Sequence, residues 1–137
     1  MEKNETIIIA DSSGIISLAI ETDTNHQLAL DIVTKLPADK LIVIIPSEVI
    51  AETLNILGKK VGHKEAVNAM EIIIESSSFL IVPASDVARR KAMNNFRSIN
   101  TSVSYIDCLI MTIAEEYNTK MIFGFDDIFK QKGFKQP

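Results

Sequence analysis

Hydrophobic residues in this chain form four short continuous runs, separated by longer stretches in which they recur every three or four positions. Runs of four or five apolar residues are typical of strands buried on both faces, and the longer spacing is typical of amphipathic helices. The pattern predicts strands at 6–10, 41–45, 79–82 and 120–123. It predicts helices at 27–35, 47–57, 64–75, 83–97 and 104–117, with a further helical stretch after residue 14.

Turn and capping residues mark several of the expected boundaries. Residues 36–39, Leu-Pro-Ala-Asp, predict a turn between the second helix and the second strand. Ser47 is a good capping residue for the helix 47–57, and Gly58 and Gly62 are expected to break that helix. Ser104 stands three residues before Asp107, which is the spacing of a capping box.

The order of these elements is strand, helices, strand, helices, strand, helices, strand. Alternation of this kind indicates right-handed crossovers between parallel strands. The expected fold class is therefore α/β, a three-layer α/β/α sandwich with a mainly parallel central sheet. At 137 residues, the whole chain is expected to form one domain.

Composition narrows the classes of protein that the chain can belong to. The single cysteine, Cys108, excludes an intramolecular disulfide, and its apolar neighbours favour a buried, unreactive thiol. The polar N-terminus does not resemble a signal peptide, and no apolar run is long enough to span a bilayer. We expect a cytoplasmic protein with no membrane partner. The formal net charge of −4 argues against bulk electrostatic wrapping of nucleic acid, but it is compatible with a nuclease whose acids hold cations.

Four acidic residues fall where an α/β protein places its active site. Asp11 and Asp126 follow apolar runs, and Glu52 and Asp107 lie in the helices 47–57 and 104–117. Ligands of open α/β sheets bind beyond the carboxyl ends of the strands, so these acids can share one rim. Carboxylates gathered there would repel one another unless a cation neutralised them, and their hard oxygen atoms suit Mg²⁺ or Mn²⁺.

Each acid also has a purely structural interpretation. Asp11 can cap the helix that follows it, and Asp107 can belong to the capping box of Ser104. Glu48 and Glu52 share one helix face, where either can be a solvated acid. Asp126 and the acid after it can begin a last helical turn, where the helix dipole favours negative charge. Periodicity alone does not choose among these interpretations.

Four segments together resemble the PIN domain (PilT N-terminal domain) family of metal-dependent ribonucleases, which includes toxins of the VapC type. They are Ile-Ile-Ala-Asp-Ser-Ser at 8–13, Pro-Ser-Glu-Val-Ile-Ala-Glu-Thr-Leu at 46–54, Ser-Tyr-Ile-Asp-Cys-Leu at 104–109 and Phe-Asp-Asp-Ile-Phe at 125–129. With the closing Lys-Gly-Phe at 132–134, the resemblance covers nearly the whole chain.

The resemblance assigns a role to particular positions of this sequence. It implies that the catalytic and metal-binding acids are Asp11, Glu52, Asp107 and Asp126, and it selects Glu52 over Glu48. It also implies that three serines support the site: Ser12, Ser13 and Ser104. Gly124 stands where many members of the family have Ser or Thr. The missing hydroxyl predicts weaker metal binding, which Gly124→Ser is expected to restore.

The implied activity is Mg²⁺- or Mn²⁺-dependent endoribonucleolytic hydrolysis of RNA. For the toxin branch, the resemblance also implies a homodimer and an antitoxin protein that occludes the site. Two other interpretations stay open on the sequence: a different metal-dependent phosphoesterase or receiver-like α/β domain, and a non-catalytic PIN-like interaction module. A receiver would carry a lysine after its last strand, whereas Lys120 precedes that strand.

Overall fold

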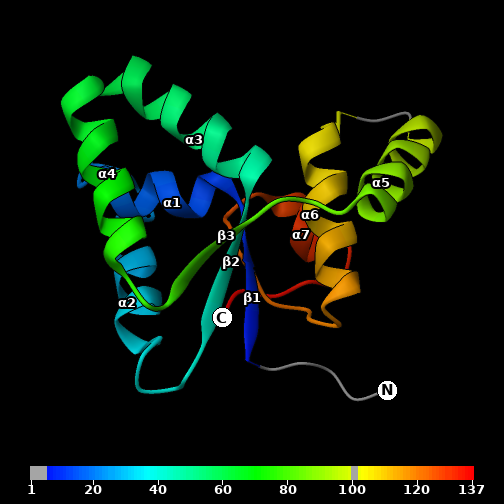
Figure 1. Cartoon of the computed structure of the whole chain (residues 1–137), viewed down its shortest axis with the longest axis horizontal. Coiled ribbons are helices and arrows are strands. Elements are labelled where there is room, and N and C mark those ends of the chain that lie inside the picture. The colour runs from blue at the N-terminus through cyan, green and yellow to red at the C-terminus, as the bar shows by residue number, and fades with distance from the viewer. Residues whose placement is uncertain (1–5, 100–101) are drawn as a thin grey trace.

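Four parallel strands form a central sheet in the order β3-β2-β1-β4 (Figure 1). The computed structural model describes residues 6–99 and 102–137. The strands are β1 (Ile7–Ala10), β2 (Ile42–Pro46), β3 (Phe79–Val82) and β4 (Ile122–Phe123). The two strands that are distant in sequence, β1 and β4, pair directly through Ile9 with Ile122 and Ala10 with Phe123. This pairing brings the segments that follow β1 and β4 together at the carboxyl edge of the sheet.

Helices cover both faces of the sheet (Figure 1). One layer contains α1 (Ser12–Ala19), α2 (His26–Lys35), α3 (Ser47–Lys60) and α4 (His63–Glu75). The other contains α5 (Asp86–Ser98), α6 (Tyr105–Glu116) and the short α7 (Asp127–Gln131). The predicted α/β/α sandwich is confirmed, and all observed strand pairs are parallel.

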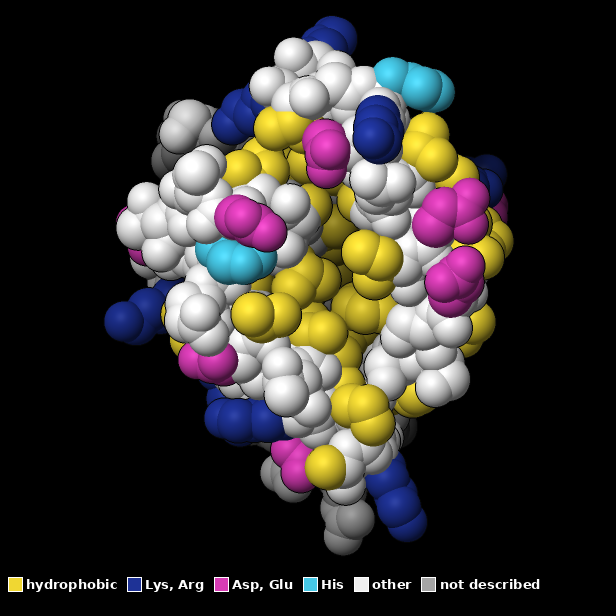
Figure 2. Space-filling model, turned by 90° about the vertical axis from the view of Figure 1, so that its left-hand side faces the viewer, with side chains coloured by type: hydrophobic (Ala, Val, Ile, Leu, Met, Phe, Trp, Pro, Cys, Tyr) yellow, Lys and Arg dark blue, Asp and Glu magenta, His cyan; other side chains and the backbone are white. Residues whose placement is uncertain are grey.

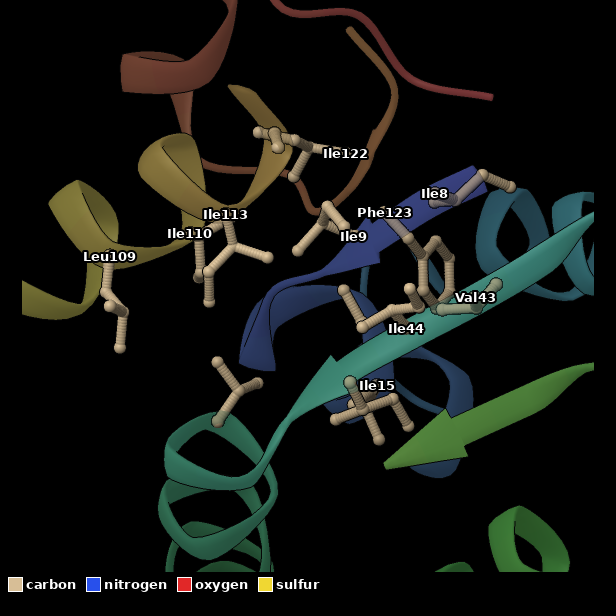
Figure 3. Close-up of a cluster of buried hydrophobic side chains, with 14 of the residues drawn as sticks. Ile8, Ile9, Ile15, Val43, Ile44, Leu109, Ile110, Ile113, Ile122 and Phe123 are labelled. Carbon is tan, nitrogen blue, oxygen red and sulfur yellow. The ribbon is translucent and has the colours of Figure 1, made fainter. Parts of the chain in front are cut away.

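The core lies where the sheet meets α6 and α1. Ile8 and Ile9 of β1 are fully buried because β1 is an inner strand with helices on both faces. Figure 3 shows isoleucines of α6 packed toward β1, and Phe123 lying beside β1 and β2. Burial of each such side chain stabilises the fold by roughly 1.5–3 kcal/mol. The apolar runs of β1 and β2 are thus explained by strands that are buried on both faces, whereas the edge strand β3 leaves Leu80 and Ile81 exposed.

The helix boundaries differ from the sequence prediction at two places in α3. Pro46 occupies the N-cap position and Ser47 is already helical, so the predicted cap at Ser47 is wrong. The predicted break at Gly58 is also wrong, because α3 continues to Lys60. A glycine costs an exposed helix only about 1 kcal/mol, and the fully buried Leu57 beside it outweighs that cost. The helix ends before Gly62, whose φ of +114° is left-handed.

Two other predicted elements begin later than expected. The helix predicted at 83–97 begins at Asp86, because Ser85 caps it by accepting a hydrogen bond from the backbone N–H of Ala88 at 3.0 Å. The strand predicted at 120–123 is reduced to Ile122–Phe123. Before it, Met121 forms an isolated bridge with Lys135, so the C-terminal tail runs beside β4.

Two expectations from composition concern the thiol and the membrane. Cys108 is buried, and this burial raises the pKa of its thiol, as expected for an unreactive packing residue. None of the helices in the described part of the chain is long and apolar enough to cross a membrane.

Candidate metal centre

Asp11 lies at the carboxyl end of β1 and is the N-cap of α1. Its side chain is only 2% exposed. One carboxylate oxygen, Oδ2, accepts hydrogen bonds from the backbone N–H of Ser13 at 3.2 Å and from the Ser13 hydroxyl at 2.6 Å. The capping interpretation of Asp11 is therefore confirmed. A carboxylate has two oxygens, so this role leaves the other oxygen for a ligand.

The surroundings of Asp11 disfavour its ionised form. Burial is the largest cause, and the negative charges of Asp126 and Asp107 add to it, so the pKa of Asp11 rises from 3.8 to about 7. The hydrogen bonds from Ser13 oppose this rise but do not cancel it. A cation beside Asp11 would reverse the balance by favouring the charged carboxylate.

Asp126 approaches Asp11 because β4 is the direct neighbour of β1. The backbone N–H of Asp11 donates to the carbonyl of Phe123 at 3.0 Å, which fixes the register at this edge. Asp126 follows shortly after β4 ends and is the N-cap of α7. Its carboxylate makes no capping hydrogen bond within α7 and is exposed, so it is available to bind a ligand.

Ser13 joins the two segments that carry these acids. While its hydroxyl donates to Asp11, the same oxygen accepts a hydrogen bond from the backbone N–H of Phe125 at 2.9 Å. Phe125 immediately precedes Asp126. Ser13 therefore sets the position of one acid and the path of the backbone leading to the other, a role that the sequence alone did not reveal.

Gly124 is required by a close approach to Asp11. A Cβ atom at this position would lie 2.8 Å from the Cβ of Asp11 and 3.3 Å from the Ser13 hydroxyl. The left-handed glycines of the described chain are Gly62 and Gly133, so conformational freedom is not the reason for this glycine. The expectation that Gly124→Ser would improve the site stays a prediction, and this geometry argues against it because an added Cβ would press on Asp11 and lie close to the Ser13 hydroxyl.

Asp107 reaches the site from α6, which lies across the sheet from α1. The predicted capping box is present: Ser104 accepts from the backbone N–H of Asp107 at 3.0 Å, and Asp107 Oδ2 accepts from the backbone N–H of Ser104 at 3.2 Å. Ser104 thus supports Asp107 directly. The box fixes the carboxylate at the start of the helix while leaving one of its oxygens unused by the box.

Three of the four predicted acids converge. Asp11, Asp107 and Asp126 each offer an oxygen atom, and these oxygens lie within 4.8 Å of one another. One member is buried, one is half-buried and one is exposed, so the cluster opens to solvent on one side. Three carboxylates at this separation, one of them with a raised pKa, fit a hard divalent cation such as Mg²⁺ or Mn²⁺.

The two glutamates of α3 are placed differently. Glu52 is half-buried and is not part of the three-carboxylate cluster among the described residues. Glu48, in the first turn, has a buried Oε1 with no hydrogen-bond partner in the described part of the chain. The metal role of Glu52 therefore stays a prediction, and Glu48 stays its competitor. Ser12 is the first residue of α1, and its supporting role also stays a prediction.

Comparison with known proteins agrees with this arrangement of strands and helices. The PIN domain family model matches residues 8–135, so the chain belongs to the PIN domain family. Among solved structures, it is similar to the Mycobacterium tuberculosis toxin VapC20, described as cleaving the sarcin-ricin loop, with a TM-score of 0.81. The two sequences are 22% identical, and the match covers 95% of this chain and 98% of VapC20. At this identity the likeness concerns the fold. The chain matches no curated protein.

Proposed function

We propose that this protein is a metal-dependent endoribonuclease that hydrolyses RNA phosphodiester bonds, with Mg²⁺ or Mn²⁺ as its cofactor. The observation that carries the proposal is the convergence of Asp11, Asp107 and Asp126 at the carboxyl edge of a PIN domain sheet. PIN family membership removes the receiver-like interpretation, and the retained acids argue against a purely non-catalytic module.

The three aspartates would hold the cation, and Glu52 would orient the attacking water or add a ligand. A bound Mg²⁺ or Mn²⁺ supplies a Lewis acid for the scissile phosphate and lowers the pKa of a water molecule. Ser13 and Ser104 keep two of the carboxylates in place through the hydrogen bonds described above. Hydrolysis then needs no protein nucleophile and no histidine.

Basic side chains near both helical layers can hold the RNA backbone. Lys59 and Lys60 are exposed at the end of α3. Arg89 and Arg90 are exposed on α5, where both form ion pairs with Asp86 at 3.8 Å and 2.9 Å. Exposed pairs of this kind are weak, so a phosphate group can replace Asp86. These contacts would add affinity and little sequence preference.

The toxin interpretation brings two protein partners into the proposal, an antitoxin and a second copy of this chain. VapC20 is a toxin, and the similarity in fold makes a toxin role the leading form of the proposal. Figure 2 shows hydrophobic side chains lining a hollow on the α1–α4 side of the molecule. On α4, Ile72 and Ile74 are more than half exposed. Apolar surface of this kind is typical of protein interfaces. A cytoplasmic location fits a pair of toxin and antitoxin.

The experiment that tests the proposal is cleavage of end-labelled single-stranded and hairpin RNAs by the purified protein. We expect internal cuts in Mg²⁺ or Mn²⁺, no cuts in EDTA, and no cuts by Asp107→Asn. The amide oxygen that this substitution introduces can still accept the hydrogen bond of the capping box, so the variant is expected to stay folded. Cleavage that persists in EDTA, or at the wild-type rate in Asp107→Asn, would contradict the proposal.

A further inference from the structure

A cavity of about 440 Å³ opens beside the acidic cluster, between the end of β4, α7 and the C-terminal tail. Asp126 belongs both to the lining of this cavity and to the three-carboxylate cluster. Any molecule held at the acids therefore has this cavity as its immediate neighbour. Its volume lies in the range of pockets that bind small ligands.

The chemistry of the walls points to a flat, partly apolar group. Phe129 and Phe134 are buried and form an apolar floor with Ile122. Phe125 also lines the cavity and is partly exposed, and its ring meets the buried Phe123 edge to face with centroids 6.3 Å apart. Aromatic rings that line a site beside a phosphate-binding centre are the usual stacking partners of unpaired nucleobases.

The rim adds groups that recognise polar edges and phosphates. The side-chain amide of Gln136 lies at the cavity and donates to the carbonyl of Gly124 over a long 3.4 Å. A contact this long is easily exchanged for a base edge, to which an amide offers both a donor and an acceptor. Lys130 and Lys135 line the same cavity and are exposed. Their charges are complementary to a sugar-phosphate chain.

The cavity is preformed by backbone hydrogen bonds. Gly133 takes a φ of +90°, which turns the chain back after α7. The backbone N–H of Phe134 then donates to the carbonyl of Phe129 at 2.9 Å. The N–H of Lys135 donates to Lys120 at 2.8 Å, and its carbonyl accepts from Ile122 at 2.9 Å. The tail is thus held along β4, and its last residues form one wall of the cavity.

We propose that this cavity binds the base of a nucleotide that flanks the scissile phosphate, with Phe125 as the stacking residue and Gln136 as the residue that reads the base edge. The inference rests on the proposed ribonuclease function, because the base would be placed by the phosphate that a cation at Asp11, Asp107 and Asp126 would hold. It assigns a determinant of cleavage-site preference to a segment that contributes just one of the metal-binding acids.

Cleavage preference tests this inference. RNAs that carry each of the four bases at the positions flanking one cut site are compared for the wild type, Phe125→Leu and Gln136→Ala. One good base contact discriminates by roughly five- to a hundredfold. We expect the wild type to show such a preference at one flanking position and both variants to lose most of it. Gln131→Ala is the matched control, because Gln131 is an exposed glutamine on α7 outside the cavity.

A binding measurement gives a readout that does not need cleavage. Asp107→Asn is mixed with RNA that carries 2-aminopurine at each position near the cut. We expect fluorescence quenching at the preferred flanking position, because the base stacks on Phe125. The quenching should disappear when Phe125→Leu is combined with Asp107→Asn, and it should persist when Gln131→Ala is combined with it.

The outcomes separate the two proposals. If RNA is cut with an unchanged base preference by folded Phe125→Leu and Gln136→Ala, the inference is overturned and the ribonuclease function stands. If the variants keep the base preference but are no longer inhibited by an antitoxin protein, the cavity binds a side chain of that protein. The inference is then also overturned. If RNA is neither cut nor bound by the wild type, both proposals fail.

Discussion

At the scale of single residues, Asp11 makes the metal-free protein sensitive to pH. Its pKa is raised from 3.8 to about 7, so the folded protein keeps a proton that the unfolded chain loses between these values. The contribution of Asp11 to stability therefore falls as pH rises from about 4 to about 7, by up to a few kcal/mol. Asp11→Asn should remove this part of the pH dependence and melt at a higher temperature than the wild type at pH 8 without metal.

Thermal melts of both proteins across this pH range, in EDTA, measure the effect. The difference between the two proteins isolates Asp11 from other titrating groups such as Asp23, whose pKa is lowered mainly by its hydrogen bond from Ser17. A difference in melting temperature that stays constant from pH 4 to pH 8 would show that Asp11 is not held neutral in the fold. Added Mg²⁺ is expected to stabilise the wild type and not Asp11→Asn.

Gly124 gives a second prediction at this scale. Because a Cβ atom would press on Asp11 at 2.8 Å, Gly124→Ala and Gly124→Ser should destabilise the fold by roughly 1–3 kcal/mol and weaken metal binding. Gly58→Ala is the control, since nothing lies within 4 Å of its added Cβ and alanine favours the helix. In urea unfolding, the free energy of unfolding should fall for the Gly124 variants and rise for Gly58→Ala. Equal or greater stability of Gly124→Ser would restore the original expectation that a hydroxyl is missing here.

At the scale of elements, the start of α3 decides between two glutamates. Glu48 lies in the first turn, where the helix dipole alone favours an acid, whereas Glu52 lies beyond that turn. Glu52 lacks this structural explanation and is the glutamate that the family resemblance selects, although the buried, unpartnered Oε1 of Glu48 keeps Glu48 as its competitor. Glu52→Gln is expected to slow RNA cleavage roughly ten- to a hundredfold. Glu48→Gln should change the rate much less. The measurement is the single-turnover rate of RNA cleavage by each variant at saturating Mg²⁺. A slower rate for Glu48→Gln than for Glu52→Gln would assign the role of the family glutamate to Glu48.

The sequence predicted elements better than contacts. Buried parallel strands leave continuous apolar runs, so all four strands could be found from residues 6–10, 41–45, 79–82 and 120–123. The end of α3 could not be predicted from the sequence, because the burial of Leu57 outweighs the tendency of Gly58 to end a helix. Asp11, Asp107 and Asp126 could be brought together by topology alone. The bridge made by Ser13 and the return of the tail along β4 depend on side-chain and loop geometry that has no periodic signal.

At the scale of the whole molecule, the open edge of the sheet is the candidate dimer surface. β3 is an edge strand, and Leu80 and Ile81 are 54% and 40% exposed. Exposed apolar edge strands tend to pair with another chain. We expect a homodimer in solution that Leu80→Lys converts to a monomer, measured by light scattering after size exclusion. Val87→Lys, at a 57% exposed position of α5 in the other helical layer, is the control, and a dimer unaffected by Leu80→Lys would exclude this edge.

The central claim is that three carboxylates, at the end of β1, in α6 and just before α7, act as one metal site for RNA cleavage. The pair Asp126 and Asp127 tests it most directly, because the two acids are adjacent and exposed, and Asp126 alone of the two belongs to the described cluster. The measurement is the Mg²⁺ dependence of RNA cleavage for Asp126→Asn and Asp127→Asn. We expect Asp126→Asn to lose cleavage or to need at least about tenfold more Mg²⁺, because removal of a residue that merely supports a metal ligand already costs about that much. Asp127→Asn is expected to have the same Mg²⁺ dependence as the wild type. Equal Mg²⁺ dependence of the two variants would contradict the central claim.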